Sequence, residues 1–345
     1  MEKDPKYPLI EAAFGRQPDR VPIWFMRQAG RYMASYQAIK AKHSFVEMIQ
    51  TPELAMEVTL QPIDELGVDA AILFSDILVT ASAMGCRFDY VEGKGPLFAD
   101  PIRTAAQVAA LRDTVEGRLD FVSNAIQLLL PELHHRNRPL IGFAGAPFTV
   151  AAFMIAGKSP HPFSQVRSWM QEHPIATAQL LEKLARVTAT YINAQIQAGV
   201  HAIQLFDTLL DQLSIAEFEA WAWPYIQSVM AGIQRPEGLP LIMFSKSIDR
   251  FWPHFIQLPI QVISVDAHTS MVTMAASVPA EIALQGNLDP QLLIHPPQDL
   301  KAQVEAILAS MRPRPGFIFN LGHGIIKETN PQTVKNIVEW VHDFR

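Results

Sequence analysis

The chain has 345 residues, 49% of them hydrophobic, which is enough to bury the core of two ordinary domains or of one large barrel. Its formal net charge of −6 gives no reason to expect bulk affinity for nucleic acid or for anionic membrane surfaces. Cys86 is the only cysteine, so an intrachain disulfide and a thiolate-based metal cluster are excluded.

The N-terminal segment MEKDPKYPLI is charged and interrupted by proline. It lacks the apolar centre of a secretion signal. No apolar run further along the chain approaches the length of a membrane span. We therefore expect a soluble cytoplasmic protein, in which any site for an anionic ligand is built from basic groups gathered locally.

Short apolar runs recur along the chain, each bounded by polar or turn residues. Because the apolar residues follow one another without alternation, each run is predicted to be a strand buried on both faces. The eight runs are Val21–Met26, Ala70–Phe74, Pro139–Phe143, Ala202–Phe206, Pro240–Phe244, Val262–Val265, Ile282–Gln285 and Gly316–Phe319.

Longer segments with a helical pattern separate these runs. They include Pro52–Leu66, Ile175–Ala198, Ile215–Ile233 and Gln298–Met311. Eight strands alternating with helices predict an α/β fold, a (β/α)8 barrel of the TIM type that forms a single domain over residues 1–345. A doubly wound sheet is the alternative, but no G-x-G-x-x-G segment follows the first strand. GKGP at Gly93–Pro96 does not fit that pattern and is expected in a loop.

Polar residues, or glycine and proline, follow every one of the eight predicted strands. In a barrel these positions share one end, the C-terminal face, where active sites are built. In chain order the segments are RQAGR, Ser75–Asp76, Ala144–Phe148, Asp207–Thr208, Ser245–Lys246, Asp266–His268, Gly286–Pro290 and Asn320–Gly324. We expect the active-site cleft at this end of the strands.

The segment WFMRQAGRY, from Trp24 to Tyr32, places two arginines where the first apolar run ends. Arg27 and Arg31 are four residues apart and flank Gly30. A guanidinium offers a planar fork that pairs with a carboxylate through two hydrogen bonds, and it keeps its charge. The spacing alone fits a carboxylate clamp, but it fits a pair of salt-bridged arginines at the mouth of a loop more readily.

Several segments taken together resemble the uroporphyrinogen decarboxylase family. They are WFMRQAGRY, VTLQP (Val58–Pro62), DAAILFSDIL (Asp69–Leu78), GKGP, GFAGAPFT (Gly142–Thr149), QLFDT (Gln204–Thr208), GNLDP and NLGHGI (Asn320–Ile325). The resemblance implies an enzyme that decarboxylates the four acetate side chains of uroporphyrinogen III, giving coproporphyrinogen III and CO2 on the route to haem. It also implies a single-domain barrel, typically a homodimer, that uses no metal and no organic cofactor.

The resemblance also gives the arginine segment a role. Uroporphyrinogen carries eight carboxylates, and Arg27 and Arg31 are expected to clamp them while Gly30 lets the backbone approach. Main-chain N–H groups of Gln28 and Ala29 are expected to add donors in the same turn.

Asp76 matches the central aspartate of the family. Its ordinary interpretation is a helix N-cap, a position that suits aspartate. In the family, the carboxylate accepts hydrogen bonds from pyrrole N–H groups and stabilises the cation formed when a ring carbon is protonated. The substrate then acts as its own electron sink. Arg27 is one candidate for the proton donor, but with a pKa of roughly 12.5 it is a poor acid, and a water or a substrate carboxylic acid held by it is equally plausible.

Further matching positions complete the expected site. His323 matches a histidine of the family that contacts the substrate. Thr208 matches a position whose hydroxyl has a similar role in the family. Phe143 and Phe206 close two predicted strands, where they can pack in the core, form flat walls against pyrrole rings, or both. Phe153 stands where the family usually has tyrosine, so a phenol is missing from the cleft.

Other departures leave alternatives open. Leu209–Asp211 replaces WAG, Asp266–Ala267 replaces DW, and Gln37 replaces an arginine. Retention of the main motifs favours a divergent active enzyme over a paralogue with a changed substrate. A non-catalytic tetrapyrrole-binding protein would not need an aspartate at the ring centre. Zinc-dependent methyltransferases of the same superfamily, which serve corrinoid or thiol acceptors, need a His-x-Cys pair and a distant cysteine that Cys86 alone cannot supply.

Overall fold

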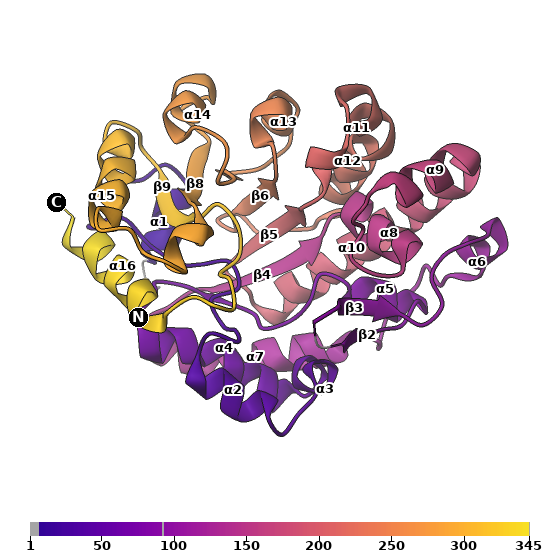
Figure 1. Ribbon diagram of the computed structural model, residues 1–345, viewed down its shortest axis with the longest axis horizontal. Coiled ribbons are helices and arrows are strands. Elements are labelled where there is room, and N and C mark those ends of the chain that lie inside the picture. The colour runs from indigo at the N-terminus through magenta and orange to yellow at the C-terminus, as the bar shows by residue number, and fades with distance from the viewer. Residues whose placement is uncertain (1–6, 92, 345) are drawn as a thin grey trace.

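The computed structural model describes residues 7–91 and 93–344. Seven parallel strands form one curled sheet in the order β1-β4-β5-β6-β7-β8-β9, and helices surround it (Figure 1). The strands are β1 (Ala71–Ile72), β4 (Leu140–Gly145), β5 (Ala202–Asp207), β6 (Leu241–Ser245), β7 (Val262–Ser264), β8 (Ala283–Leu288) and β9 (Phe317–Leu321). Seven of the eight predicted strands are therefore present, each in its predicted place.

The first predicted strand lies between β9 and β1 and closes the sheet into a barrel. It forms a single parallel bridge, from Ile23 to Phe319, rather than a regular strand. The Trp24 N–H donates to the Phe319 carbonyl at 3.3 Å, and on the other side the Asp69 N–H donates to the Ile23 carbonyl at 2.7 Å. The TIM-type barrel is confirmed, with this bridging segment in the place of the eighth strand.

Side chains explain why the bridging segment is not a regular strand. The Ile23 N–H donates to Asp69 Oδ2 at 3.0 Å, and the Met26 N–H donates to Asn320 Oδ1 at 3.1 Å. These main-chain donors are satisfied by side chains, so they do not contribute to a ladder of main-chain hydrogen bonds.

Helices pack around the outside of the sheet (Figure 1). They are α1 (Pro8–Ala13), α2 (Ala34–Lys40), α3 (Phe45–Gln50), α4 (Pro52–Leu66), α5 (Val79–Met84), α6 (Ala105–Ala110), α7 (Asp120–His135), α8 (Pro147–Ala156), α9 (Ser164–Glu172), α10 (Pro174–Ala198), α11 (Ile215–Trp221), α12 (Trp223–Gly232), α13 (Ile248–Phe255), α14 (Met271–Ser277), α15 (Leu300–Met311) and α16 (Pro331–Asp343), with 3-10 turns η1 (Leu210–Gln212) and η2 (Pro290–Leu293). The predicted helix at Pro52–Leu66 is confirmed to the residue. The one predicted at Ile215–Ile233 is divided, because Pro224 starts a new helix after a break at Ala222. No helix among the described residues is long and apolar enough to cross a membrane.

A short antiparallel hairpin lies outside the barrel sheet, next to α5 (Figure 1). It pairs β2 (Phe88–Val91) with β3 (Gly95–Phe98). The prediction that Gly93–Pro96 is a loop is wrong for Gly95 and Pro96, which belong to β3. Gly93 and Gly95 have φ of 76° and 77°, a conformation that glycine adopts freely and that allows the chain to reverse tightly.

Candidate active site

The arginine segment forms a sharp turn at the C-terminal end of the bridging segment, and Gln28 holds this turn from inside. The buried Gln28 side chain accepts from the Phe25 N–H at 3.1 Å and donates to the Ala70 carbonyl at 3.0 Å. The side chains of Arg27 and Arg31 are exposed. The buried amide thus ties the turn to β1, and both guanidiniums remain available to a ligand.

Two expectations about this turn change. The main-chain N–H of Gln28 donates to the Phe25 carbonyl at 3.1 Å, so it is occupied within the protein and not free for a ligand. The unusual backbone lies at Arg27, with φ of 59°, and not at Gly30, where an added Cβ would meet nothing closer than the Arg27 carbonyl at 3.5 Å. Ala29 is half-buried beside them. A strained non-glycine residue of this kind is characteristic of functional sites.

Gly324 provides the space that the side chain of Arg27 needs. A Cβ on Gly324 would lie 2.4 Å from Arg27 Cδ, far inside van der Waals contact. The glycine of the NLGHG segment therefore brings Arg27 against the end of β9. This close approach joins the arginine turn and the histidine segment into one site.

Asp76 follows β1 and is held by two hydrogen bonds. Its Oδ1 accepts from the Leu78 N–H at 2.8 Å, and its Oδ2 accepts from the Tyr90 hydroxyl at 2.7 Å. The bond to Leu78 is an Asx-type turn before α5 rather than an N-cap, because Leu78 itself is the N-cap residue. Burial raises the pKa of Asp76, whereas both hydrogen bonds and the charge of Arg27 act to lower it.

His323 is a neutral hydrogen-bond donor. Its Nδ1 accepts from the Gly324 N–H at 2.8 Å, so the ring proton is on Nε2. Burial, together with the charges of Arg27 and Lys246, lowers the pKa of His323 to about 3. The ring therefore remains uncharged near neutral pH and offers one N–H to an acceptor such as a carboxylate.

A row of aromatic rings crosses the C-terminal ends of four strands. Phe143 packs edge-on against Phe206 with centroids 5.7 Å apart, and Phe206 lies 5.8 Å from Phe244. Phe244 in turn packs edge-on against His323 at 6.0 Å. Phe143 and Phe206 are buried. The structure thus links both phenylalanines to the histidine through Phe244, although more than a hundred residues separate them from His323 in the sequence.

Thr208 and Phe153 occupy the edges of this region. Thr208 follows β5 and is half-buried, directly after the buried Asp207. Phe153 lies on α8 and is half-buried against the hydrophobic core. Contact of either side chain with a substrate remains a prediction.

Sequence reasoning missed two residues of the site. Tyr90 was missed because it lies on the hairpin, next to a segment whose glycines predicted a loop. Lys246 directly follows β6 and is half-buried, with its charge acting on His323. Its position after a strand was visible in the sequence, but a lone lysine carries no specific chemical signature.

The cations of the site have no close carboxylate partners. Within residues 7–91 and 93–344, no salt bridge joins Arg27, Arg31 or Lys246 to an acidic side chain. Asp76 acts on Arg27 through space but bonds to Tyr90 instead. In a chain of net charge −6, this local excess of positive charge favours a ligand with several carboxylates.

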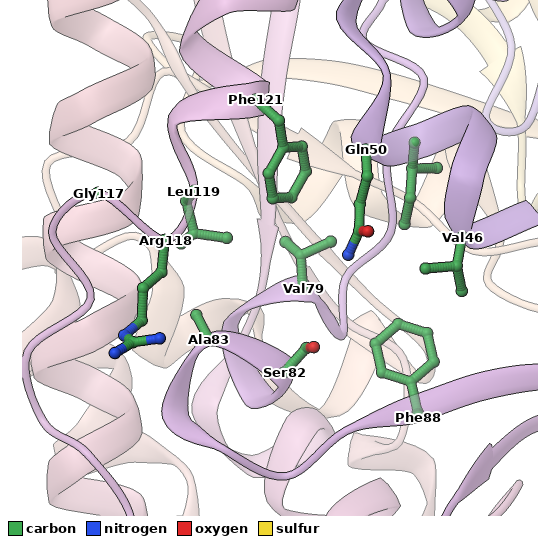
Figure 2. A pocket seen from close by; sticks show the side chains of 11 residues that line it. Val46, Gln50, Val79, Ser82, Ala83, Phe88, Gly117, Arg118, Leu119 and Phe121 are labelled. Carbon is green, nitrogen blue, oxygen red and sulfur yellow. The ribbon is translucent and has the colours of Figure 1, made fainter.

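A separate cavity of about 250 Å³ lies on the flank of the molecule between α3, α5 and the start of α7 (Figure 2). Its lining includes Val46, Val79, Arg118 and Phe88, and none of the expected site residues. Phe88 connects the two regions, because its ring packs edge-on against the ring of Tyr90 with centroids 6.0 Å apart.

The sequence model of the family described as Uroporphyrinogen decarboxylase (URO-D) matches residues 4–344. The uroporphyrinogen decarboxylase of Geobacter sp. (strain M21) is 42% identical over 335 residues, which cover 97% of each chain. That of Protochlamydia amoebophila is 40% identical over 338 residues, covering 98% of this chain and 92% of the relative. Among solved structures, a methyltransferase from Methanosarcina mazei superposes with a TM-score of 0.80 over 97% of both chains, and at 19% identity this similarity shows the fold alone.

Proposed function

The chain belongs to the uroporphyrinogen decarboxylase family, and from this premise we propose that it is a carboxy-lyase of haem biosynthesis. Its reaction removes CO2 from the four acetate side chains of uroporphyrinogen III and leaves methyl groups, giving coproporphyrinogen III. We further propose that it acts in the cytoplasm as a homodimer and without a metal or organic cofactor.

The substrate carboxylates are held by the cations of the site. Arg27 and Arg31 extend from the turn and offer two-pronged hydrogen bonds, while Lys246 supplies a point charge from the end of β6. His323 adds a neutral Nε2–H donor near both Arg27 and Lys246, whose charges act on its ring. A substrate with carboxylates around its rim is suited to cations that come from three separate elements.

Asp76 stabilises the reacting ring. A proton adds to the pyrrole α-carbon next to the carbon that bears the acetate, and the ring becomes cationic. The bond to CO2 then breaks, its electrons neutralise the ring, and a proton taken up by the exocyclic carbon completes the methyl group as the ring carbon loses its own. A fixed carboxylate beside the ring lowers the energy of the cation, as an oxyanion hole does for an anion. The proton donor is Arg27, or a water or substrate carboxylic acid that it holds.

The observation that carries the proposal is the arrangement of Asp76. A half-buried carboxylate is held from two sides by Leu78 and Tyr90, and Arg27 is the cation that acts on it. A protein that only bound a polycarboxylate would not need a negative charge here, because the charge repels the carboxylates, whereas a decarboxylase needs it to stabilise the cationic ring.

An anaerobic assay with uroporphyrinogen, in which products are separated by carboxylate number, tests the proposal. We expect successive products down to the four-carboxylate porphyrinogen, at a rate that exhaustive chelation leaves unchanged. Tight binding without any loss of carboxylates would identify a binding protein. Turnover of a different tetrapyrrole would identify a paralogue.

The methyltransferase alternative conflicts with the chemistry of Cys86. This cysteine is buried, its Sγ donates to the Asp100 carbonyl at 3.6 Å, and burial raises the pKa of its thiol to about 12. A thiol that holds its proton so firmly is a poor zinc ligand.

A further inference from the structure

We propose that Tyr90 is a positioning residue for Asp76, carried to the site by the β2–β3 hairpin. Its hydroxyl fixes the carboxylate in one orientation and keeps it ionised for the step in which the ring is cationic. The inference rests on the proposed function and deepens it, because it identifies a residue on which the central carboxylate depends.

The hydrogen bond from Tyr90 is short and well placed. The hydroxyl donates to Asp76 Oδ2 at 2.7 Å, while the Leu78 N–H occupies Oδ1 at 2.8 Å. Each carboxylate oxygen can accept a further hydrogen bond, so two donors orient the group without using all of its acceptor capacity. Lone pairs remain for pyrrole N–H groups, and the carboxylate presents them in a fixed direction.

The ring of Tyr90 is held independently of its hydroxyl. It packs on Phe45 of α3 with centroids 4.4 Å apart, and edge-on against Phe88 of its own strand at 6.0 Å. Because these contacts involve only the ring, removing the hydroxyl leaves the packing of the hairpin intact. The phenol therefore has a role that phenylalanine, with the same ring, does not fill.

The charge state of Asp76 depends on a small set of groups. Burial raises the pKa of Asp76, and the hydrogen bonds from Tyr90 and Leu78 together with the charge of Arg27 act to lower it. Tyr191 is buried on α10 and Tyr36 lies on α2, where its phenol acts on Tyr90. Burial and Asp76 raise the pKa of Tyr90, so the phenol keeps its proton and remains the donor. Removal of the hydroxyl takes away one of the few groups that favour the ionised carboxylate.

Tyr90→Phe tests the proposal through the pH dependence of turnover. Wild type should lose kcat/KM at low pH as Asp76 takes up a proton. In Tyr90→Phe this acid limb should move upward by about 1–2 pH units, because a hydrogen bond to a charged group has been lost. Tyr225→Phe, which removes a half-buried phenol on α12, is the matched control and should leave the limb in place. A purely structural role for Tyr90 would lower kcat/KM by one factor at every pH.

A double-mutant cycle adds a second readout. In an Asp76→Asn background the hydroxyl has no carboxylate to hold, so Tyr90→Phe should change kcat by less than about twofold. An acid limb that stays in place in Tyr90→Phe, or an equal loss of kcat in both backgrounds, would overturn the proposal.

Stability measurements separate this inference from the proposed function. Whether or not wild type turns over uroporphyrinogen, Tyr90→Phe should lower the urea midpoint more at pH 8 than at pH 5, since the bond is stronger to the ionised carboxylate. Equal shifts at the two pH values would contradict the role of Tyr90 and leave the proposed function untouched. If wild type is inactive on uroporphyrinogen but Tyr90→Phe shows the expected pH-dependent loss of stability, the proposed function is contradicted and the role of Tyr90 is supported.

Discussion

At the scale of single residues, Arg27 combines an unusual backbone with a guanidinium that forms no salt bridge to any acidic side chain in the described part of the chain. Lysine and arginine are strained alike at the φ of 59° that residue 27 adopts. Arg27→Lys therefore removes the forked guanidinium and leaves the backbone strain unchanged. We expect KM to rise and kcat to fall, together lowering kcat/KM by roughly 10- to 100-fold. Arg31→Lys should show a milder loss, because Arg31 has no described interaction with Asp76 or His323. Steady-state kinetics on both variants would contradict the two-pronged clamp if each matched wild type.

Lys246 allows a different test, because its charge acts on His323 and not on Asp76. Lys246→Met keeps the length of the side chain and removes the charge. We expect KM to rise roughly tenfold while kcat changes much less, as for a contact made equally in the ground and transition states. Lys301→Met, an exposed lysine on α15 paired with Glu305, is the control. A fall in kcat at unchanged KM would show that Lys246 acts on the reacting ring instead.

The residues that sequence reasoning identified share one property. Arg27, Asp76 and His323 belong to specific short motifs, so each was recognised before its neighbours in space were known. Tyr90 and Lys246 have no such motif, and their roles depend on contacts that only the folded chain creates. The sequence did not predict the left-handed conformation of Arg27. Glycine is the residue expected to adopt that conformation, and Gly30 lies three residues further along the same turn.

At the scale of elements, α8 begins over a buried carboxyl group. Thr149, in the first turn of the helix, donates its hydroxyl to Asp207 Oδ1 at 2.5 Å. Burial raises the pKa of Asp207 to about 7, and neighbouring Asp211 adds to the effect. This carboxyl anchors α8 to the end of β5, the strand that leads to Thr208.

Asp207 should therefore make stability depend on pH. Its pKa in the folded protein lies above the unfolded value of roughly 3.9, so its contribution is present below that value and is lost as pH rises through about 7. Asp207→Asn cannot ionise, so its free energy of unfolding should not fall with pH for this reason. Relative to wild type, that free energy should rise by up to about 1.4 kcal/mol per pH unit between pH 5 and 7. Urea unfolding at both pH values, with exposed Asp113→Asn as control, measures the difference. A gap between wild type and Asp207→Asn that does not change with pH would contradict the raised pKa.

Periodicity predicted the barrel elements well because the strands are short, mostly buried apolar runs and helices such as α4 and α10 are long enough to show a helical pattern. It failed where side chains replace main-chain partners. The apolar pattern of the bridging segment predicts a strand, but the side chains of Asp69 and Asn320 accept hydrogen bonds from its N–H groups. The β2–β3 hairpin was missed for the opposite reason, since Gly93 and Gly95 indicate a loop although they serve a tight reversal between paired strands.

At the scale of the whole molecule, the barrel supports its reactive end with a buried polar network. The Trp24 indole donates to Gln285 Oε1 at 2.9 Å, and Gln285 Nε2 donates to Gln204 at 3.1 Å and to Ser264 at 2.9 Å. These side chains come from the bridging segment and from β8, β5 and β7. The network joins the bridging segment to the strands across the barrel, and so it holds the arginine turn in register with the other strand ends.

At the scale of the whole molecule, the central claim is that the negative charge of Asp76, in a site that also gathers Arg27, Arg31 and Lys246, stabilises the reacting ring. The most direct test compares wild type with Asp76→Asn in the anaerobic assay with uroporphyrinogen, after far-ultraviolet circular dichroism and urea unfolding have shown that both are folded. The change preserves shape and removes the charge. We predict that wild type proceeds to the four-carboxylate product and that kcat of Asp76→Asn falls roughly 100-fold or more. Turnover near the wild-type rate in a folded Asp76→Asn protein would contradict the central claim.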